Sequence, residues 1–116
     1  MTDNEKIAKW RGYLYVDQRI KQPFQDNGLS GWRDWPHGKD VGIAFDTDIA
    51  LWHGEGGLLY EIGKRNRSGD FIDALFALCE YTDDRSDNED WDWYLLAATP
   101  AQLAAALVRM IDDDNA

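Results

Sequence analysis

One ten-residue segment of this chain is too densely charged to enter a protein core. Residues 83–92 contain six carboxylates and a single arginine, Arg85. Like charges at this density repel one another, and an unpaired carboxylate loses much hydration free energy when it is buried. We therefore expect a solvated acidic loop over about 82–92. The core must then be built from the apolar stretches on either side of it.

The charge of the 116-residue chain is unevenly distributed. Residues 1–58 hold nine acidic and seven basic side chains, whereas residues 59–116 hold thirteen and five, for a formal net charge of −10. A negative surface repels phosphate groups, so the charge argues against direct nucleic-acid binding. Two interpretations of the acidic loop stay open: a solubilising connector, or a contact surface for a basic partner protein.

Aromatic residues at the end of the loop favour the contact interpretation. Trp91, Trp93 and Tyr94 interleave with Asp90 and Asp92, and aromatic rings beside carboxylates suit Arg- and Lys-rich surfaces through ion pairs and cation–π contacts. No catalytic, cofactor-binding or metal-binding residue is predicted. The predicted partner-binding residues are Asp83, Asp84, Asp87, Glu89, Asp90, Trp91, Asp92 and Trp93.

Composition and length favour one compact domain over residues 1–116. Hydrophobic residues make up 44% of the chain and aromatic residues 13%, including six tryptophans, which is typical of a packed core. No apolar run approaches the roughly 18 residues of a membrane span, and the N-terminus lacks a signal peptide. A lone cysteine, Cys79, cannot form an internal disulfide. The expected location is the cytoplasm, with the protein a monomer or homodimer.

The first half of the chain predicts one helix, two strands and a long loop. Thr2-x-x-Glu5 is a capping-box pattern, and the helix that it begins is expected to end near Gly12. Residues 13–16 predict a strand, and the alternation of Val41, Ile43 and Phe45 predicts a second.

Residues 23–40, between these two strands, are interrupted by Gly28, Gly31, Pro36 and Gly38. This punctuation predicts a loop. Because the segment contains Trp32 and Trp35, at least one indole is expected to fix it to the core.

The second half predicts helices. Asp48 can cap a short turn over 49–52, and the glycine-rich residues 53–57 should end it. A further helix begins at Leu58. Its inward face is expected to hold Leu58, Leu59 and Ile62, and its outward face Glu61 and Lys64. A third helix is expected to be N-capped by Asp70, and its apolar stripe contains Phe71, Leu75, Leu78 and Cys79. A last helix follows the capping box Thr99-Pro100-Ala101-Gln102. Its buried face is expected to contain Leu103, Leu107, Met110 and Ile111.

Residues 93–98 fit either a strand or a helical turn. The aspartates at 112–114 oppose the helix dipole, so residues 112–116 are expected to fray. The predicted class is α+β: mostly helical, with a small antiparallel sheet, arranged as a layered α/β sandwich.

Catalytic and metal motifs are weak. Residues 41–48, ending in Asp46-Thr47-Asp48, resemble the strand and Asp-x-Asp of haloacid-dehalogenase-type phosphatases, which implies a magnesium-dependent phosphohydrolase. The alternative is that Asp46 ends a strand and Asp48 caps a helix. An EF-hand beginning at Asp84 would place Glu89 where glycine is required and Leu95 where a bidentate glutamate is required.

The cysteine and histidines do not support catalysis or zinc binding. Cys79 lies on an apolar stripe and is expected to be a core thiol, and with His37 and His53 it provides too few ligands for structural zinc. The loop 53–57 precedes a helix, but it lacks the lysine and Ser/Thr of a phosphate-binding loop, so it is expected to be a turn.

Two stretches resemble small proteins of tailed phages and prophages that carry a phage ABA (α–β–α) sandwich domain. One is residues 45–50 running into 57–62, and the other is Leu96-Ala97-Ala98-Thr99-Pro100-Ala101-Gln102 followed by Ala104-Ala105-Ala106-Leu107. The resemblance implies a phage or prophage origin and a layered α/β fold. That family has no catalytic residues to carry over.

The functional hypothesis is a non-enzymatic phage or prophage protein inside a bacterial host. We expect it to inhibit a nucleic-acid-handling defence complex, as anti-CRISPR proteins do, with its carboxylates imitating a run of phosphates on a basic groove. Two alternatives stay open: the magnesium-dependent phosphohydrolase using Asp46 and Asp48, and a small structural or accessory phage protein. No cofactor is expected.

Overall fold

The structure is a computed structural model, and it describes residues 2–36, 44–54, 56–79 and 98–115. The described elements confirm the α+β class, mostly helical with a small antiparallel sheet. In chain order they are α1 (Asp3–Arg11), β1 (Leu14–Val16), β2 (Arg19–Asp26), β3 (Leu29–Asp34), the 3₁₀ turn η1 (Ile49–Leu51), α2 (Leu58–Lys64), α3 (Ser68–Cys79) and α5 (Pro100–Asp114).

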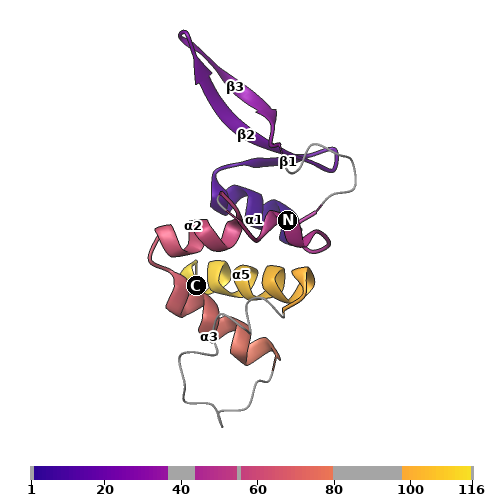
Figure 1. Cartoon of the computed structure of the whole chain (residues 1–116), viewed down its shortest axis with the longest axis vertical. Helices are drawn as coiled ribbons and strands as arrows, with labels where there is room; N and C mark the ends of the chain where they lie inside the picture. Colours follow the sequence, from indigo (N-terminus) through magenta and orange to yellow (C-terminus); the bar gives the residue numbers. More distant parts are fainter. Residues whose placement is uncertain (1, 37–43, 55, 80–97, 116) are drawn as a thin grey trace.

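The elements follow one another along the long axis of the molecule. Figure 1 shows the β2–β3 hairpin at one end, then β1 above α1 and α2, then α5, and α3 at the other end. α1 contacts both β1 and α5, and α5 packs on α3. No helix in the described ranges is both long enough and apolar enough to span a lipid bilayer.

The N-terminal helix and the strand after it match their predictions. The Thr2 hydroxyl accepts a hydrogen bond from the Glu5 backbone N–H at 3.2 Å, which begins α1. Gly12 ends the helix in the left-handed conformation (φ 87°), where a side chain is strained. The chain then enters β1.

Residues 23–40 are not one loop, so that prediction is wrong. β2 and β3 form an antiparallel hairpin closed by Asn27 (φ 50°) and Gly28 (φ 82°). Positive φ at both turn positions is the conformation whose twist matches two antiparallel strands. The dipeptide Asn-Gly is the strongest local signal for such a hairpin, and it marks what the sequence interpretation missed.

The predicted strand at 41–45 falls partly outside the described residues. Of that stretch, Ala44 and Phe45 are described, and they belong to a turn rather than a strand. Asp48 caps η1 as predicted, because its carboxylate accepts a hydrogen bond from the Ala50 N–H at 2.9 Å.

The core is centred on two buried aromatic residues and on α5. The Trp52 indole donates a hydrogen bond to the Phe45 carbonyl at 2.7 Å and stacks on Phe71 with ring centroids 6.3 Å apart. Trp35 is only 5% exposed and packs on Phe45 and Tyr13. The expected anchoring of this region by an indole is therefore confirmed for Trp35, whereas Trp32 is 48% exposed.

The helices match their predictions in outline and differ at three positions. Glu61, predicted to face outward, is buried. α3 begins at Ser68, so Asp70 lies in its first turn rather than at the N-cap. Leu78, assigned to the apolar stripe, is 42% exposed. α5 extends to Asp114, and the fraying expected at residues 112–116 stays a prediction.

Candidate functional site

The eight predicted partner-binding residues, 83–93, lie outside the described residues. The structure describes the two helices that precede and follow them in the chain. α3 runs to Cys79, the chain returns at the buried Ala98, and α3 and α5 pack directly against each other. Residues 80–97, here called the acidic segment, are therefore connected at both ends to one packed helix pair.

The return into α5 is fixed by local hydrogen bonds. The Thr99 hydroxyl accepts from the Gln102 N–H at 3.1 Å, and the Gln102 side chain accepts from the Thr99 N–H at 2.9 Å. Pro100 occupies the first turn, where its missing N–H costs nothing. This is the reciprocal capping box that the sequence predicts, and it sets the position at which the chain enters the helix.

The α3–α5 pair is held by apolar faces that meet in the core. Leu75 on α3 and Leu103 and Leu107 on α5 are fully buried, and Met110 is 3% exposed. Asp73 and Ala77 lie on the outer side of α3, as the spacing predicts. The inward faces stabilise the pair, so the polar outer faces are left for the solvent.

A cleft of about 290 Å³ lies between the polar sides of α3 and α5. Arg67 crosses one end of it, with Nε 2.9 Å from the Asp70 carboxylate and two guanidinium nitrogens 2.6 and 2.8 Å from the Asp114 oxygens. Asp73, Arg109 and Asp113 complete its charged lining.

The ion pairs of Arg67 shift the pKa values of Asp114 and of Arg67 itself. Its hydrogen bonds hold the pKa of Asp114 below the ordinary value for a carboxyl. The hydrogen bonds that Arg67 donates to Asp114, and to a smaller extent the one to Asp70, raise the pKa of Arg67. Both groups therefore stay ionised at neutral pH, which maintains the ion pair between them.

The described part of the chain holds no cluster of three or more His, Cys, Asp or Glu side chains arranged to hold a metal ion. The carboxylates of the cleft are instead engaged by Arg67 or exposed to solvent. The cleft is thus an ion-paired seam between two helices.

Ion pairs involve five acidic and six basic side chains of the described residues. Lys6 lies 3.1 Å from Asp112, Arg19 and Lys21 both pair with Asp34, and Glu61 is bound by Arg11 and Arg65 at 2.9 and 2.8 Å. The described residues hold thirteen acids and ten bases in total, whereas residues 80–97 hold seven acids and one base. Most of the net charge therefore belongs to that single segment.

The Asp46/Asp48 pair is used structurally. Asp48 caps η1, and the Asp46 carboxylate accepts a hydrogen bond from the Asn4 side chain at 3.4 Å. Burial, followed by the charges of Asp46 and Glu5, raises the pKa of Tyr15. The sheet of the described residues is wholly antiparallel, so it does not supply the parallel strand on which the phosphatase pair would stand.

The glycine-rich stretch at 53–57 is a compact turn where the structure describes it. Gly54 and Gly56 have φ of 89° and 84°, and the Gly57 N–H bonds to the Gly54 carbonyl at 3.1 Å. A Cβ at Gly57 would lie 2.7 Å from the Trp52 carbonyl oxygen. Glycine is therefore required by backbone geometry, which agrees with the predicted turn.

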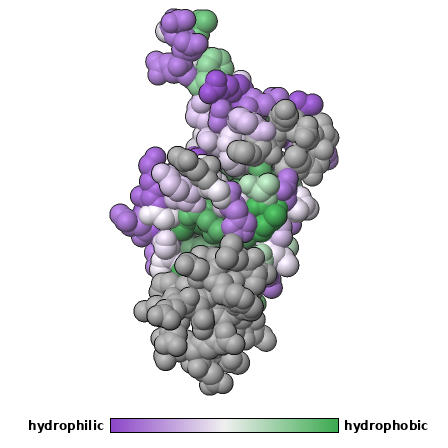
Figure 2. All heavy atoms as spheres, in the orientation of Figure 1, coloured by the Kyte–Doolittle hydropathy of each residue, from purple (hydrophilic) through white to green (hydrophobic). Residues whose placement is uncertain are grey.

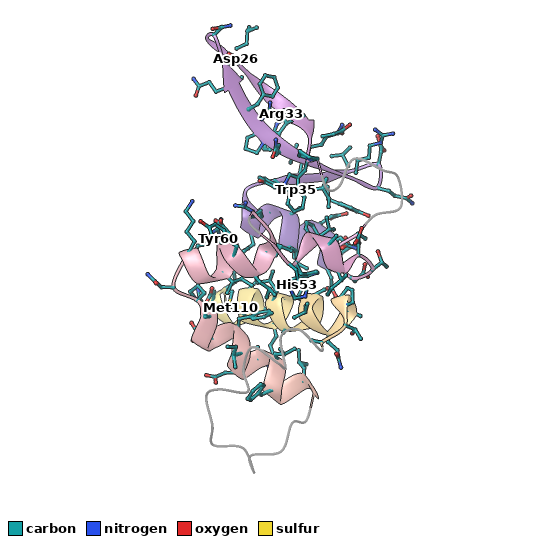
Figure 3. The ribbon with its side chains drawn as sticks, in the orientation of Figure 1. Asp26, Arg33, Trp35, His53, Tyr60 and Met110 are labelled. Atoms are coloured by element: carbon teal, nitrogen blue, oxygen red, sulfur yellow. The ribbon has the colours of Figure 1, made fainter. Side chains whose placement is uncertain are left out.

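The sequence interpretation assigned no role to the β2–β3 hairpin. Its outer part, residues 22–33, is here called the β-arm. Figure 3 places Asp26 at its far end, Arg33 along it and Trp35 where it meets the helices. Figure 2 shows hydrophobic atoms close to the tip. Leu29, which pairs with Asp26 next to the turn, is 72% exposed. This is a second exposed surface, at the opposite end of the molecule from α3.

Comparison of the chain with protein-family models, with curated protein sequences and with solved structures finds no match.

Proposed function

We propose that this protein is a non-enzymatic inhibitor that docks on a basic protein surface through the acidic segment. The carrying observation is the separation of charge: residues 80–97 hold seven acids against one base, while the described residues hold thirteen acids against ten bases. At physiological ionic strength, fields are screened beyond about 8 Å, so a partner responds to the local density of charge rather than to the total. A dense acidic segment thus steers this end of the molecule onto a basic partner.

The partner class follows from the same chemistry. Closely spaced carboxylates resemble the phosphates of a nucleic acid, and a groove lined by Lys and Arg accepts either. We propose a nucleic-acid-handling defence complex in a bacterial cytoplasm as the target, which is the anti-CRISPR mode of action. The resemblance to phage ABA sandwich proteins supports a phage or prophage origin. Trp91 and Trp93 would supply aromatic contacts beside the carboxylates.

The test is competition for DNA. Purified CRISPR surveillance complexes are incubated with labelled target DNA and increasing amounts of this protein, and DNA binding is measured by mobility shift. The proposal predicts that at least one complex releases its DNA, and that the inhibition weakens as salt is raised. If no complex of the panel is affected at any ratio, the proposed defence target is wrong.

A matched pair of variants separates local charge from total charge. Asp83→Lys, Asp87→Lys and Asp90→Lys together should abolish inhibition, because they reverse half of the carboxylates in residues 83–92. The control changes Asp26, Asp73 and Asp113 to lysine; all three are exposed and make no ion pair within the described ranges. Both triple variants change the net charge equally. Equal loss of inhibition in the two would contradict docking through the acidic segment.

A further inference from the structure

The two long edges of the β-arm differ in how they are protected. In an antiparallel pair of strands, each pair of directly opposite residues is here called a rung. Rungs that exchange two backbone hydrogen bonds alternate with rungs that exchange none. The Trp35 N–H bonds to the Ile20 carbonyl at 2.9 Å, which fixes the alternation for the whole hairpin. It follows that Ser30, Trp32 and Asp34 direct their N–H and C=O groups away from β2, toward the outer edge of β3.

The outer edge of β2 is blocked. β1 covers it only as far as Lys21, and by the same alternation the next outward-facing position is Pro23, which has no N–H to donate. Proline and lysine are the usual residues that keep an exposed strand edge from pairing with another chain. β3 contains neither between Leu29 and Asp34, and within the described residues no strand pairs with its outer edge.

We infer that the outer edge of β3 pairs with the same edge of a second copy of this chain. The arm suits a copy of itself because it has no net charge: residues 22–33 hold one acid and one base in a chain whose charge is −10. Two molecules that repel each other elsewhere can meet there. An isolated two-stranded ribbon is only marginally stable in water, whereas four strands side by side give each inner strand two neighbours.

The positions of the outward groups select a register. A two-fold axis normal to the sheet at Trp32 places the two Trp32 residues opposite each other and places each Ser30 opposite Asp34 of the second copy. No like charges face each other in this register. The exposed Trp32 and Leu29 lie on the strand that is brought into contact. The pairing joins the two arms and leaves the two α3 helices at the far ends of the dimer.

The first test is oligomeric state by sedimentation velocity over a roughly hundredfold range of protein concentration. The expected result is a shift from a 13.3 kDa species toward twice that mass as concentration rises. A six-residue edge is a small interface, so we expect a reversible equilibrium rather than a permanent dimer. A monomer at every concentration would overturn the inference. In that case the outer edge of β3 would instead be available for pairing with an extended segment of another protein.

Two proline variants on the same rung provide the specific test. Ser30 and Gln25 are register partners, and their N–H groups face opposite edges of the β-arm. Ser30→Pro removes a donor from the β3 edge in both copies, so the dissociation constant should rise at least about tenfold. Gln25→Pro removes a donor from the edge already blocked by Pro23 and should dimerise as the natural chain does. Equal dimerisation of both variants would contradict the β3 edge as the interface.

Disulfide trapping tests the register and does not depend on either proline. In a Cys79→Ser background, Trp32→Cys should form an intermolecular disulfide on oxidation, since hydrogen-bonded rung partners have Cα atoms about 5.5 Å apart. Ser30→Cys in the same background should not, because the two Ser30 residues would lie four rungs apart. Cross-linking through Ser30→Cys but not Trp32→Cys would refute this register. The inference does not depend on the proposed inhibitor function, because none of these measurements involves a nucleic-acid-handling partner.

Discussion

Glu61 shows how one buried carboxylate joins two helices. It lies on α2, and its two oxygens bind Arg65 on the next turn and Arg11 at the end of α1. Arg65 in turn donates to the Trp10 carbonyl at 2.7 Å and lies 4.1 Å from the centre of the Trp10 ring. The periodicity of α2 places Glu61 on the outer side, but two arginines from different elements make its burial favourable.

Replacing Glu61 by alanine should therefore cost more than the loss of one surface charge. The change leaves Arg11 beside a like charge, with the Tyr13 ring at 4.9 Å as its remaining partner among the described side chains. We expect Glu61→Ala to lower the free energy of unfolding by about 2–3 kcal/mol. Chemical denaturation measures this, with the exposed Glu5→Ala expected to cost less than about 1 kcal/mol. Equal costs would show that the two arginines do not depend on Glu61.

Asp114 gives a pH-dependent contribution whose sign follows from its hydrogen bonds with Arg67. Because Arg67 lowers the pKa of Asp114 in the folded protein, the stabilisation is complete above the ordinary carboxyl pKa of about 3.9 and is lost as pH falls through the lowered value. Asp114→Asn should be less stable than the natural chain at neutral pH, and the difference should vanish in strong acid. Thermal unfolding over the acid range measures it.

Asp113→Asn is the control for that measurement. Asp113 neighbours Asp114 but makes no ion pair in the described part of the chain. A pH-independent deficit in Asp114→Asn, or the same deficit in Asp113→Asn, would contradict the role given to the Arg67 contact.

At the scale of elements, local capping signals predicted helix boundaries well. α1, η1 and α5 all begin next to the Thr or Asp that the sequence marks. Such caps are satisfied by residues two or three positions away, so the pattern contains the whole interaction. The burial of Glu61 was predicted incorrectly because its partner Arg11 lies elsewhere in the chain. α3 begins at Ser68, two residues before the predicted cap Asp70.

Thr99 tests how much the capping box stabilises α5. Thr99→Ala removes the hydroxyl that accepts from the Gln102 N–H, and we expect the free energy of unfolding to fall by about 1 kcal/mol. Thr99→Ser keeps the hydroxyl and should stay within about 0.5 kcal/mol of the natural chain. If serine costs as much as alanine, the methyl group rather than the cap is responsible.

The β-arm depends on its turn. Gly28 has φ 82° with open space around it, so Gly28→Ala strains the backbone without a steric clash. We expect faster amide hydrogen exchange within the arm, corresponding to a local cost of about 1 kcal/mol, with little change in the helices. Gly63→Ala on α2, at negative φ and in ordinary contact with Ser68, is the matched control and should leave arm exchange unchanged. Faster exchange throughout the helices of Gly28→Ala would contradict a locally unfolding arm.

At the scale of the molecule, the arm makes the protein elongated. The principal extents are 53, 30 and 26 Å, and the radius of gyration is 15.0 Å, against about 13.4 Å for a compact domain of this length. Figure 1 shows that the hairpin accounts for one end of the long axis. Beyond the anchors Ile20 and Trp35, the arm adds length without joining the helical core.

Shortening the arm should leave the helices folded. Deleting residues 23–26 and 29–32 joins Gln22 and Arg33, another hydrogen-bonded rung, through the same Asn27-Gly28 turn. We expect the radius of gyration at low concentration to fall toward about 13–14 Å and the thermal midpoint to change by only a few degrees. Small-angle scattering and circular dichroism measure these. Loss of the helical transition would show that the arm belongs to the cooperative core.

The sequence by itself determined the helix caps, the apolar faces and the concentration of charge in residues 83–92, because each depends on side chains close together in the chain. The Asn27-Gly28 turn of the β2–β3 hairpin was also a local signal, which the sequence interpretation missed. The tertiary structure decided the burial of Glu61 and the anchoring role of Trp35. Those features depend on partners up to 50 residues away, such as the Arg11 that Glu61 binds. No local pattern contains that information, and only the packed chain brings the groups together.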